Sequence, residues 1–228
     1  MKHIFSFFLL LSLLVSCSND PYDTGNGAYS DMRAEFVELL TDNASHVVSM
    51  NTDGNVHLVL SSAYQVKWCE KADTVYRALA YYKPVTTSQG AECAELMGLT
   101  QVMVAHPYAA TAYKNGVKTD PVTFYSAWKS SNNKYVNLEF DIKTGAVDGT
   151  IGQQTVGVVC DAVESQTKGG KLFRLRLYHD QNNVPTYYST KLYLSVPLSA
   201  LPTTCAAGDS IAFTVNTFKG ETVKGIAL

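Results

Sequence analysis

The sequence predicts an all-β protein with two domains, a small barrel followed by an antiparallel β-sandwich. Apolar residues make up 46% of the chain, enough for a core, and charged residues only 17%, below the ~25% typical of soluble domains. Fourteen tyrosines and many Val and Thr residues favour strands. Short runs that alternate apolar and polar residues are separated by Gly, Asp and Asn turns, and no segment of the mature chain predicts a helix.

The first seventeen residues predict export and lipid attachment. Lys2 is followed by an apolar run over 4–14, which is too short for the ~20 apolar residues of a membrane-spanning helix. The sequence Leu14-Val15-Ser16-Cys17 matches a bacterial lipobox, in which the cysteine thiol takes the lipid and a small preceding residue admits the peptidase. We therefore interpret 1–17 as a lipoprotein signal peptide and Cys17 as the lipid attachment site. An ordinary signal peptide that happens to end near a cysteine is the alternative.

Residues 18–28 are rich in Pro, Gly, Asn and Asp, which predicts a flexible tether to the membrane. Ser18 is not the residue that usually retains lipoproteins at the inner membrane. The expected location is therefore the outer membrane, facing the periplasm or the cell surface.

The first domain is expected over 29–108. Strand-like runs cover 32–40, 47–50, 56–60, 74–82 and 94–105, and Asp53-Gly54 between the second and third runs predicts a hairpin. Five strands in about 80 residues suit a closed barrel, and we predict one that resembles an OB fold.

The second domain is expected over 118–228, after a linker at 109–119 that contains the turn signal Asn115-Gly116. Alternating runs cover 122–128, 136–142, 156–160, 172–178, 188–198 and 211–215. Their number and spacing predict an immunoglobulin-like antiparallel β-sandwich.

Four cysteines remain after lipidation, two in each predicted domain. An oxidising compartment permits disulfides, and the favoured pairing is Cys69 with Cys93 and Cys160 with Cys205. The alternative is four buried free thiols that act as small apolar residues. None of the spacings predicts a zinc or CxxC redox site.

Motifs for catalysis are not found in the sequence: it contains no HExxH, GxSxG, P-loop or GxGxxG. We therefore expect no enzyme activity, catalytic residue, metal or cofactor. His179-Asp180 could form an acid–base pair, but a strand end before a polar turn explains it better. Arg174 and Arg176 could hold an anion, although a solvated strand face is the simpler interpretation. Neither half of the chain carries the basic patch that nucleic-acid binding needs.

Aromatic pairs are the best candidates for a binding surface. Tyr81-Tyr82 and Tyr187-Tyr188 each place one ring on either face of a strand, so one ring of each pair should point outward. We take Tyr82 and Tyr187 as the candidate binding residues. The alternative is that these rings pack under loops.

The second half resembles the NigD-like lipoprotein family. The residues that carry the resemblance are Leu175-Arg176-Leu177-Tyr178-His179-Asp180-Gln181-Asn182, Leu192-Tyr193-Leu194-Ser195-Val196-Pro197-Leu198 and Gly208-Asp209-Ser210-Ile211. Ala72-Asp73-Thr74-Val75-Tyr76-Arg77 carries it in the first half. The resemblance implies an N-terminal OB domain, a C-terminal β-sandwich and an outer-membrane lipoprotein of Gram-negative anaerobes. It also implies an association with bacteriocin loci, where members are proposed to confer immunity, and it supplies no catalytic residues.

Two hypotheses for the function follow. The first is a non-catalytic binding lipoprotein whose partner is a protein such as a toxin, and the second is a glycan-binding accessory lipoprotein. The sequence alone does not separate them.

Overall fold

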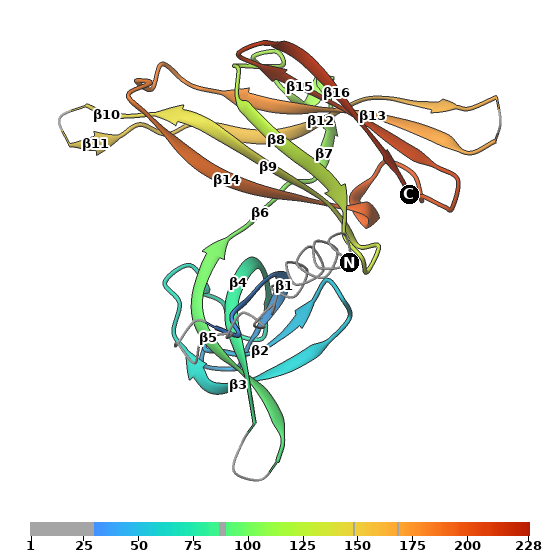
Figure 1. Ribbon diagram of the computed structural model, residues 1–228. Coiled ribbons are helices and arrows are strands. Elements are labelled where there is room, and N and C mark those ends of the chain that lie inside the picture. Colours follow the sequence, from blue (N-terminus) through green and yellow to red (C-terminus); the bar gives the residue numbers. More distant parts are fainter. Residues whose placement is uncertain (1–29, 87–89, 148, 168) are drawn as a thin grey trace, which may run out of the picture. The chain divides into compact units, whose positions relative to one another are not determined.

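The computed structural model describes residues 30–86, 90–147, 149–167 and 169–228. The predicted signal peptide, the tether and Cys17 lie outside the described residues. Residues Arg33–Leu228 form one compact unit that is built almost entirely from strands (Figure 1).

The first five strands form a closed barrel, as the sequence predicts. They are β1 (Arg33–Thr41), β2 (Val47–Thr52), β3 (His57–Tyr64), β4 (Val75–Thr86) and β5 (Glu92–Gln101). Around the barrel they follow the order β1-β2-β3-β5-β4, and β1 closes it by pairing antiparallel with β4 from Arg33↔Tyr82 to Leu40↔Val75. Among the described barrel strands, β3 and β5 are the one pair that runs parallel.

The predicted hairpin at Asp53-Gly54 is confirmed. β2 and β3 pair up to Asn51↔His57, and the Thr52 amide donates to the Val56 carbonyl at 2.9 Å. Asn55 has φ 62°, a left-handed conformation that asparagine tolerates better than most residues. Local turn chemistry therefore sets the register here.

The strand predicted over 94–105 was wrong at its C-terminal end. β5 ends at Gln101, and β6 (Met103–Val104) pairs parallel with β14 of the sandwich. The Val102 amide between them donates to the Arg77 carbonyl at 3.1 Å. The apolar run 94–105 therefore contributes strands to both the barrel and the sandwich. The periodicity of the sequence does not show where the chain passes from one to the other.

Two sheets form the second half. One contains β7 (Pro107–Ala109), β12 (Thr155–Ser165), β13 (Lys171–Asp180), β15 (Ser210–Thr217) and β16 (Gly220–Ala227), in the order β16-β15-β13-β12-β7. The other contains β6, β8 (Thr123–Lys129), β9 (Tyr135–Thr144) and β14 (Tyr188–Pro197), in the order β6-β14-β9-β8. A short pair, β10 (Ala146–Val147) and β11 (Thr150–Ile151), extends beyond β9 as a separate hairpin (Figure 1).

The sandwich departs from the prediction in three ways. It is not purely antiparallel, because the pairs β12–β7, β13–β15 and β14–β6 are parallel. The short pair β10–β11 and the edge strand β16 were not predicted. The predicted linker 109–119 contacts the sandwich: Ala109 pairs with Cys160, and the Lys118 carbonyl accepts from the His179 amide at 3.0 Å.

Each half has its own hydrophobic core. The barrel core includes Val37, Leu39, Met50 and Tyr82. The sandwich core combines inward residues of both sheets, such as Leu138 and Phe140 from β9 with Phe173 and Phe213 from the opposite sheet. The exact ends of the two domains stay a prediction.

Candidate binding site

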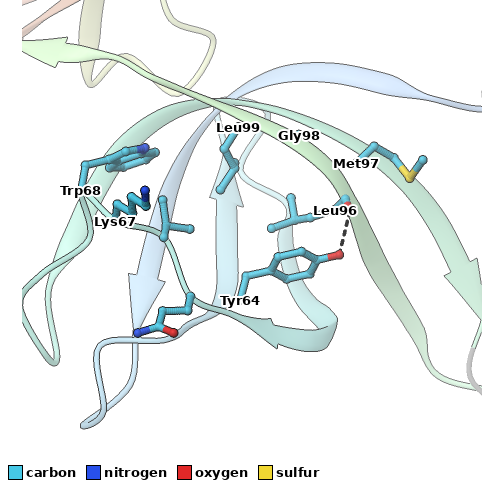
Figure 2. A pocket seen from close by; sticks show the side chains of 9 residues that line it. Tyr64, Lys67, Trp68, Leu96, Met97, Gly98 and Leu99 are labelled. Atoms are coloured by element: carbon cyan, nitrogen blue, oxygen red, sulfur yellow. Dashed lines mark hydrogen bonds between the residues drawn. The ribbon is translucent and has the colours of Figure 1, made fainter.

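An open groove on the side of the barrel is the candidate binding site (Figure 2). Its volume is about 400 Å³, within the ~300–1,000 Å³ range of ligand pockets. The residues that line it come from the end of β3, the segment that follows β3, and β5: Tyr64, Gln65, Val66, Lys67, Trp68, Leu96, Met97, Gly98 and Leu99.

The groove exists because β3 and β5 pair only briefly. Among the described residues, a single ladder pair, Leu60↔Ala94, joins the two strands. Beyond it β3 turns toward β2, where Tyr64 pairs with Val47. The Tyr64 hydroxyl bridges the gap and donates to the Leu96 carbonyl at 2.8 Å, the dashed line in Figure 2.

The groove lining is mostly apolar and aromatic. Tyr64, Leu96 and Leu99 converge in the middle of the groove, and Met97 points away from Leu96 (Figure 2). The Trp68 ring packs edge-on against Tyr76, with 6.0 Å between the ring centroids. A rigid aromatic ring and a partly exposed methionine are typical of surfaces that bind proteins.

Among the described residues that line the groove, Lys67 alone is charged. Two residues further along the chain, Cys69 packs into the barrel core with only 2% of its surface exposed. Burial raises the pKa of the Cys69 thiol to about 11, so the thiol stays protonated and unreactive at neutral pH. The chemistry of the groove is therefore apolar contact plus one cation.

A buried polar network lies between barrel and sandwich residues and is satisfied internally. Arg77 of β4 donates both terminal nitrogens to the Asp53 carboxylate, each at 2.7 Å. Its Nε donates to Ser195 Oγ at 3.2 Å, and Nη2 donates to Asn137 Oδ1 at 3.3 Å. The guanidinium also lies over the Tyr135 ring, 4.2 Å from its centroid. Because each side-chain nitrogen of Arg77 already donates to a neighbouring side chain, this network serves the fold rather than a ligand.

Glu38 adds a second polar contact between the same two parts. Its carboxylate accepts from Lys134 Nζ at 2.8 Å and from the Tyr135 hydroxyl at 2.9 Å. Burial alone would raise the pKa of Glu38, but these hydrogen bonds outweigh it and lower the pKa below its ordinary value. Burial, with the bond to Glu38 as the next cause, raises the pKa of Tyr135 to about 12.

A second groove, of about 480 Å³, lies beside the edge of the sandwich formed by β7 and β12. The Tyr113 ring stacks on Tyr178, with 4.4 Å between the centroids and 21° between the planes. The Tyr113 hydroxyl donates to the Val158 carbonyl at 3.0 Å, which fixes the ring. Tyr108 is 57% exposed at the same groove, where its ring is available for stacking.

Comparison with known proteins identifies the family. The profile of the NigD-like C-terminal β-sandwich domain matches residues 106–227, more than half of the chain. This chain belongs to the NigD-like family. No protein of curated function matches this NigD-like protein in sequence.

Solved structures share its fold. A NigD-like immunity protein from Bacteroides caccae is 24% identical, with a TM-score of 0.64 over 85% of this chain and 90% of that chain. A protein from Parabacteroides distasonis, provisionally described as toxin-related, is 15% identical, with a TM-score of 0.65 over 87% and 93%. A protein from Bacteroides fragilis, provisionally described as a lipoprotein, is 15% identical, with a TM-score of 0.60 over 86% and 97%. At these identities the likeness establishes the fold alone.

The tyrosines predicted as a binding surface lie in different environments. The expectation that the Tyr82 ring points outward is wrong: it is 1% exposed in the barrel core, where its hydroxyl donates to Glu35 at 2.8 Å. Tyr187 is 76% exposed, as expected of an outward ring, and its binding role stays a prediction. The two residues belong to different halves of the protein, and only Tyr187 lies at a surface.

The four cysteines are free thiols in this NigD-like protein. Cys69, Cys93 and Cys160 are buried, and Cys205 is half-buried. Neither favoured bridge is present in the structure, which instead has the alternative arrangement of free thiols. Disulfide formation in the exported protein stays a prediction.

The other polar candidates have partners within the fold. His179 is buried between the Asp120 carbonyl, 3.0 Å from Nδ1, and Gln154, 2.8 Å from Nε2. Arg174 and Arg176 form ion pairs with Glu164 and Asp161. Among the described residues, no group of three or more His, Cys, Asp or Glu side chains could hold a metal ion, and no helix is long and apolar enough to cross a membrane.

Sequence reasoning missed the residues that line both grooves. Trp68, one of only two tryptophans, lies in a segment without strand periodicity between two predicted strands. Tyr108 and Tyr113 lie at or within the predicted linker. These segments were not predicted to form strands, so their aromatic residues were not needed for a strand face. That is the sequence feature that could have indicated a binding surface.

Proposed function

We propose that the mature protein is a non-catalytic, lipid-anchored binding module of the cell envelope whose ligand is a segment of another protein. Its family, and a structural relative named as an immunity protein, support a role in protecting the cell from a secreted toxin. The barrel groove carries the proposal, because a groove with an aromatic side wall and a single cation suits an apolar protein segment.

The anchor is proposed to be lipid on Cys17, with the protein at the outer membrane. Two or more acyl chains, at ~0.8 kcal/mol per buried CH₂, hold a protein stably on a bilayer. Cells fed an alkyne-tagged fatty acid should label the wild-type protein, and Cys17→Ser should lose the label. A labelled Cys17→Ser variant would overturn this part of the proposal.

The binding function is tested by capture and by protection. Lipid-free Ser18–Leu228 keeps every described residue and is used as bait against secreted proteins of competing strains. A strain that lacks the gene is then complemented with wild type, with Trp68→Ala or with the control Lys114→Glu, and is exposed to the captured protein. The control changes an exposed lysine of the sandwich half. Wild type and Lys114→Glu should protect, whereas Trp68→Ala should not. Equal survival with and without the gene would contradict the immunity role.

Glycan binding is the second candidate, and the Tyr108–Tyr113–Tyr178 groove favours it. A fixed, stacked pair of tyrosines beside an exposed ring suits the flat faces of sugars. The test is a glycan array probed with Ser18–Leu228 and with Tyr108→Ala. Signals that disappear in Tyr108→Ala would support this candidate, and a blank array would exclude it for the glycans tested.

A further inference from the structure

The β5 strand has two edges that are used very differently. On one edge it pairs with β4 along its whole length, from Thr86↔Glu92 to Ala78↔Gln101. On the other edge, among the described residues, ladder pairing is limited to Leu60↔Ala94. Within the part of the chain that the structure describes, the stretch 96–101 therefore has no partner strand on this edge, and residues 96–99 of the stretch line the groove.

An unpaired strand edge is a row of amide and carbonyl groups that another strand can match. Proteins blunt such edges with charges, bulges or covering segments. Here the register shifts at Met97, which is a bulge, and the Tyr64 hydroxyl bonds to one carbonyl, that of Leu96. The described residues of β5 that line the groove, 96–99, include no charged side chain.

We propose that an extended peptide segment binds in this groove by adding as a strand to the free edge of β5 between Leu96 and Gln101. This inference rests on the proposed function and specifies how the protein partner is recognised. Backbone hydrogen bonds to β5 supply affinity, and alternate side chains of the added strand enter the apolar groove. The edge makes a peptide the matching ligand, since a lipid tail has no backbone groups to pair with it.

Charge complementarity specifies the occupant further. Lys67 is the only charge in the groove lining, and no hydrogen bond or ion pair to its side chain is found among the described residues. An extended segment with apolar residues at alternate positions would match the apolar lining of the groove, and one carboxylate on it would pair with Lys67. The partner's segment is expected to be an exposed strand or a disordered stretch that becomes extended on binding.

The experiment selects ligands and then tests their backbone. A random dodecapeptide phage library is selected on Ser18–Leu228, and the enriched peptides are synthesised. Each is remade with N-methyl groups on alternate amides, in the two possible registers, which keeps the side chains but blocks hydrogen bonds on one edge at a time. Binding is measured by calorimetry, and hydrogen exchange of the protein follows the amides of 96–101.

The expected result has three parts. Enriched peptides alternate apolar and polar residues and contain Asp or Glu. N-methylation in one register abolishes binding while the other register has little effect, and the amides of 96–101 that point away from β4 become protected. Lys67→Glu weakens binding roughly two- to fivefold, as for an exposed ion pair, and Lys114→Glu leaves it unchanged.

Three results would overturn the proposal. They are the absence of enriched peptides, equal effects of both N-methyl registers, and unchanged exchange at 96–101. If the native secreted partner is nevertheless captured, and this protein still protects cells against it in a way that depends on Trp68, the proposed function holds and only the strand-addition mode fails. If no partner is captured and deletion has no phenotype, the proposed function itself fails.

Discussion

At the scale of single residues, burial decides which of the four thiols can react. Cys69 is buried, and its pKa of about 11 leaves roughly 10⁻⁴ of it as thiolate at pH 7. Burial also raises the pKa of Cys160. Cys205 is half-buried and is therefore the thiol that a reagent reaches most easily.

We expect a maleimide at pH 7 to label Cys205 first and the other three thiols only after unfolding. Intact mass after timed labelling, with and without guanidinium, measures this order. Cys205→Ser should lack the fast adduct. Equally rapid labelling of Cys69 would contradict the burial argument, and masses that show no free thiols in unreduced, unfolded protein would establish disulfides.

Glu38 predicts a pH dependence of stability. Its pKa in the folded state lies below the ordinary value of 4.5, so its bonds to Lys134 and Tyr135 stabilise the fold fully above pH 4.5. This contribution is lost as the pH falls through the folded-state pKa. Glu38→Gln should therefore be less stable than wild type at pH 7, and the difference should shrink toward pH 3.

Urea unfolding at a series of pH values measures that difference. Glu221→Gln, which changes an exposed residue of β16, serves as the control and should show little difference at any pH. A Glu38→Gln penalty that is the same at pH 3 and pH 7 would mean that the ionised carboxylate is not the stabilising form.

At the scale of elements, the turn between β12 and β13 depends on glycine for two separable reasons. Gly169 has φ +87° and Gly170 has φ +85°, conformations that other residues adopt only with strain. A Cβ on Gly169 would meet no atom of the described residues within 4 Å, its chain neighbours aside. A Cβ on Gly170 would collide with the carbonyl of Gly208. Only the second position therefore combines strain with a steric clash.

Gly169→Ala should cost about 1 kcal/mol of unfolding free energy, the usual cost of a left-handed alanine. Gly170→Ala should cost about 1–3 kcal/mol more, because the backbone at Gly208 must move. Paired urea titrations of the two variants measure the excess. Equal costs would show that the turn relaxes without disturbing its neighbour.

The sequence predicts elements well where local patterns determine them, and poorly where distant contacts do. The β2–β3 hairpin follows from its Asp-Gly turn, and β13 follows from strict alternation between Leu172 and Tyr178. β16 is exposed at nearly every position, so it has no apolar face to reveal it. The parallel pairs and the short seam between β3 and β5 arise from long-range packing that no local pattern encodes.

The same reasoning explains the outcome at the candidate site. Alternation at Tyr81-Tyr82 shows that the two rings face opposite ways, but not which one faces the barrel interior. Tyr82 lies inside because the register of β4 against β1 places it there, next to Glu35. The groove around Trp68 depends on the gap between β3 and β5, which only the folded barrel creates.

At the scale of the whole molecule, Arg77 couples the two cores. The residue is 4% exposed, and its guanidinium bonds within the barrel to Asp53 and across to Ser195 and Asn137 of the sandwich. Removing one partner of a buried ion pair leaves the other charge unpaired and typically lowers the free energy of unfolding by about 3–5 kcal/mol. We therefore expect the two halves to unfold together, and to separate when Arg77 is replaced.

The two tryptophans make this prediction measurable, since Trp68 lies in the barrel half and Trp128 in the sandwich half. Trp68→Phe leaves a sandwich probe, and Trp128→Phe leaves a barrel probe. In urea, both probes should report one coincident transition for an otherwise wild-type chain, and two separate transitions once Arg77→Met is added. Arg174→Met is the control, because it removes an arginine from an exposed ion pair with Glu164. It should lower the free energy of unfolding by less than about 1 kcal/mol and leave the two transitions coincident. Coincident transitions in Arg77→Met would show that apolar contacts kept in both probe chains, such as that of Phe36 with Tyr193, are sufficient to couple the halves.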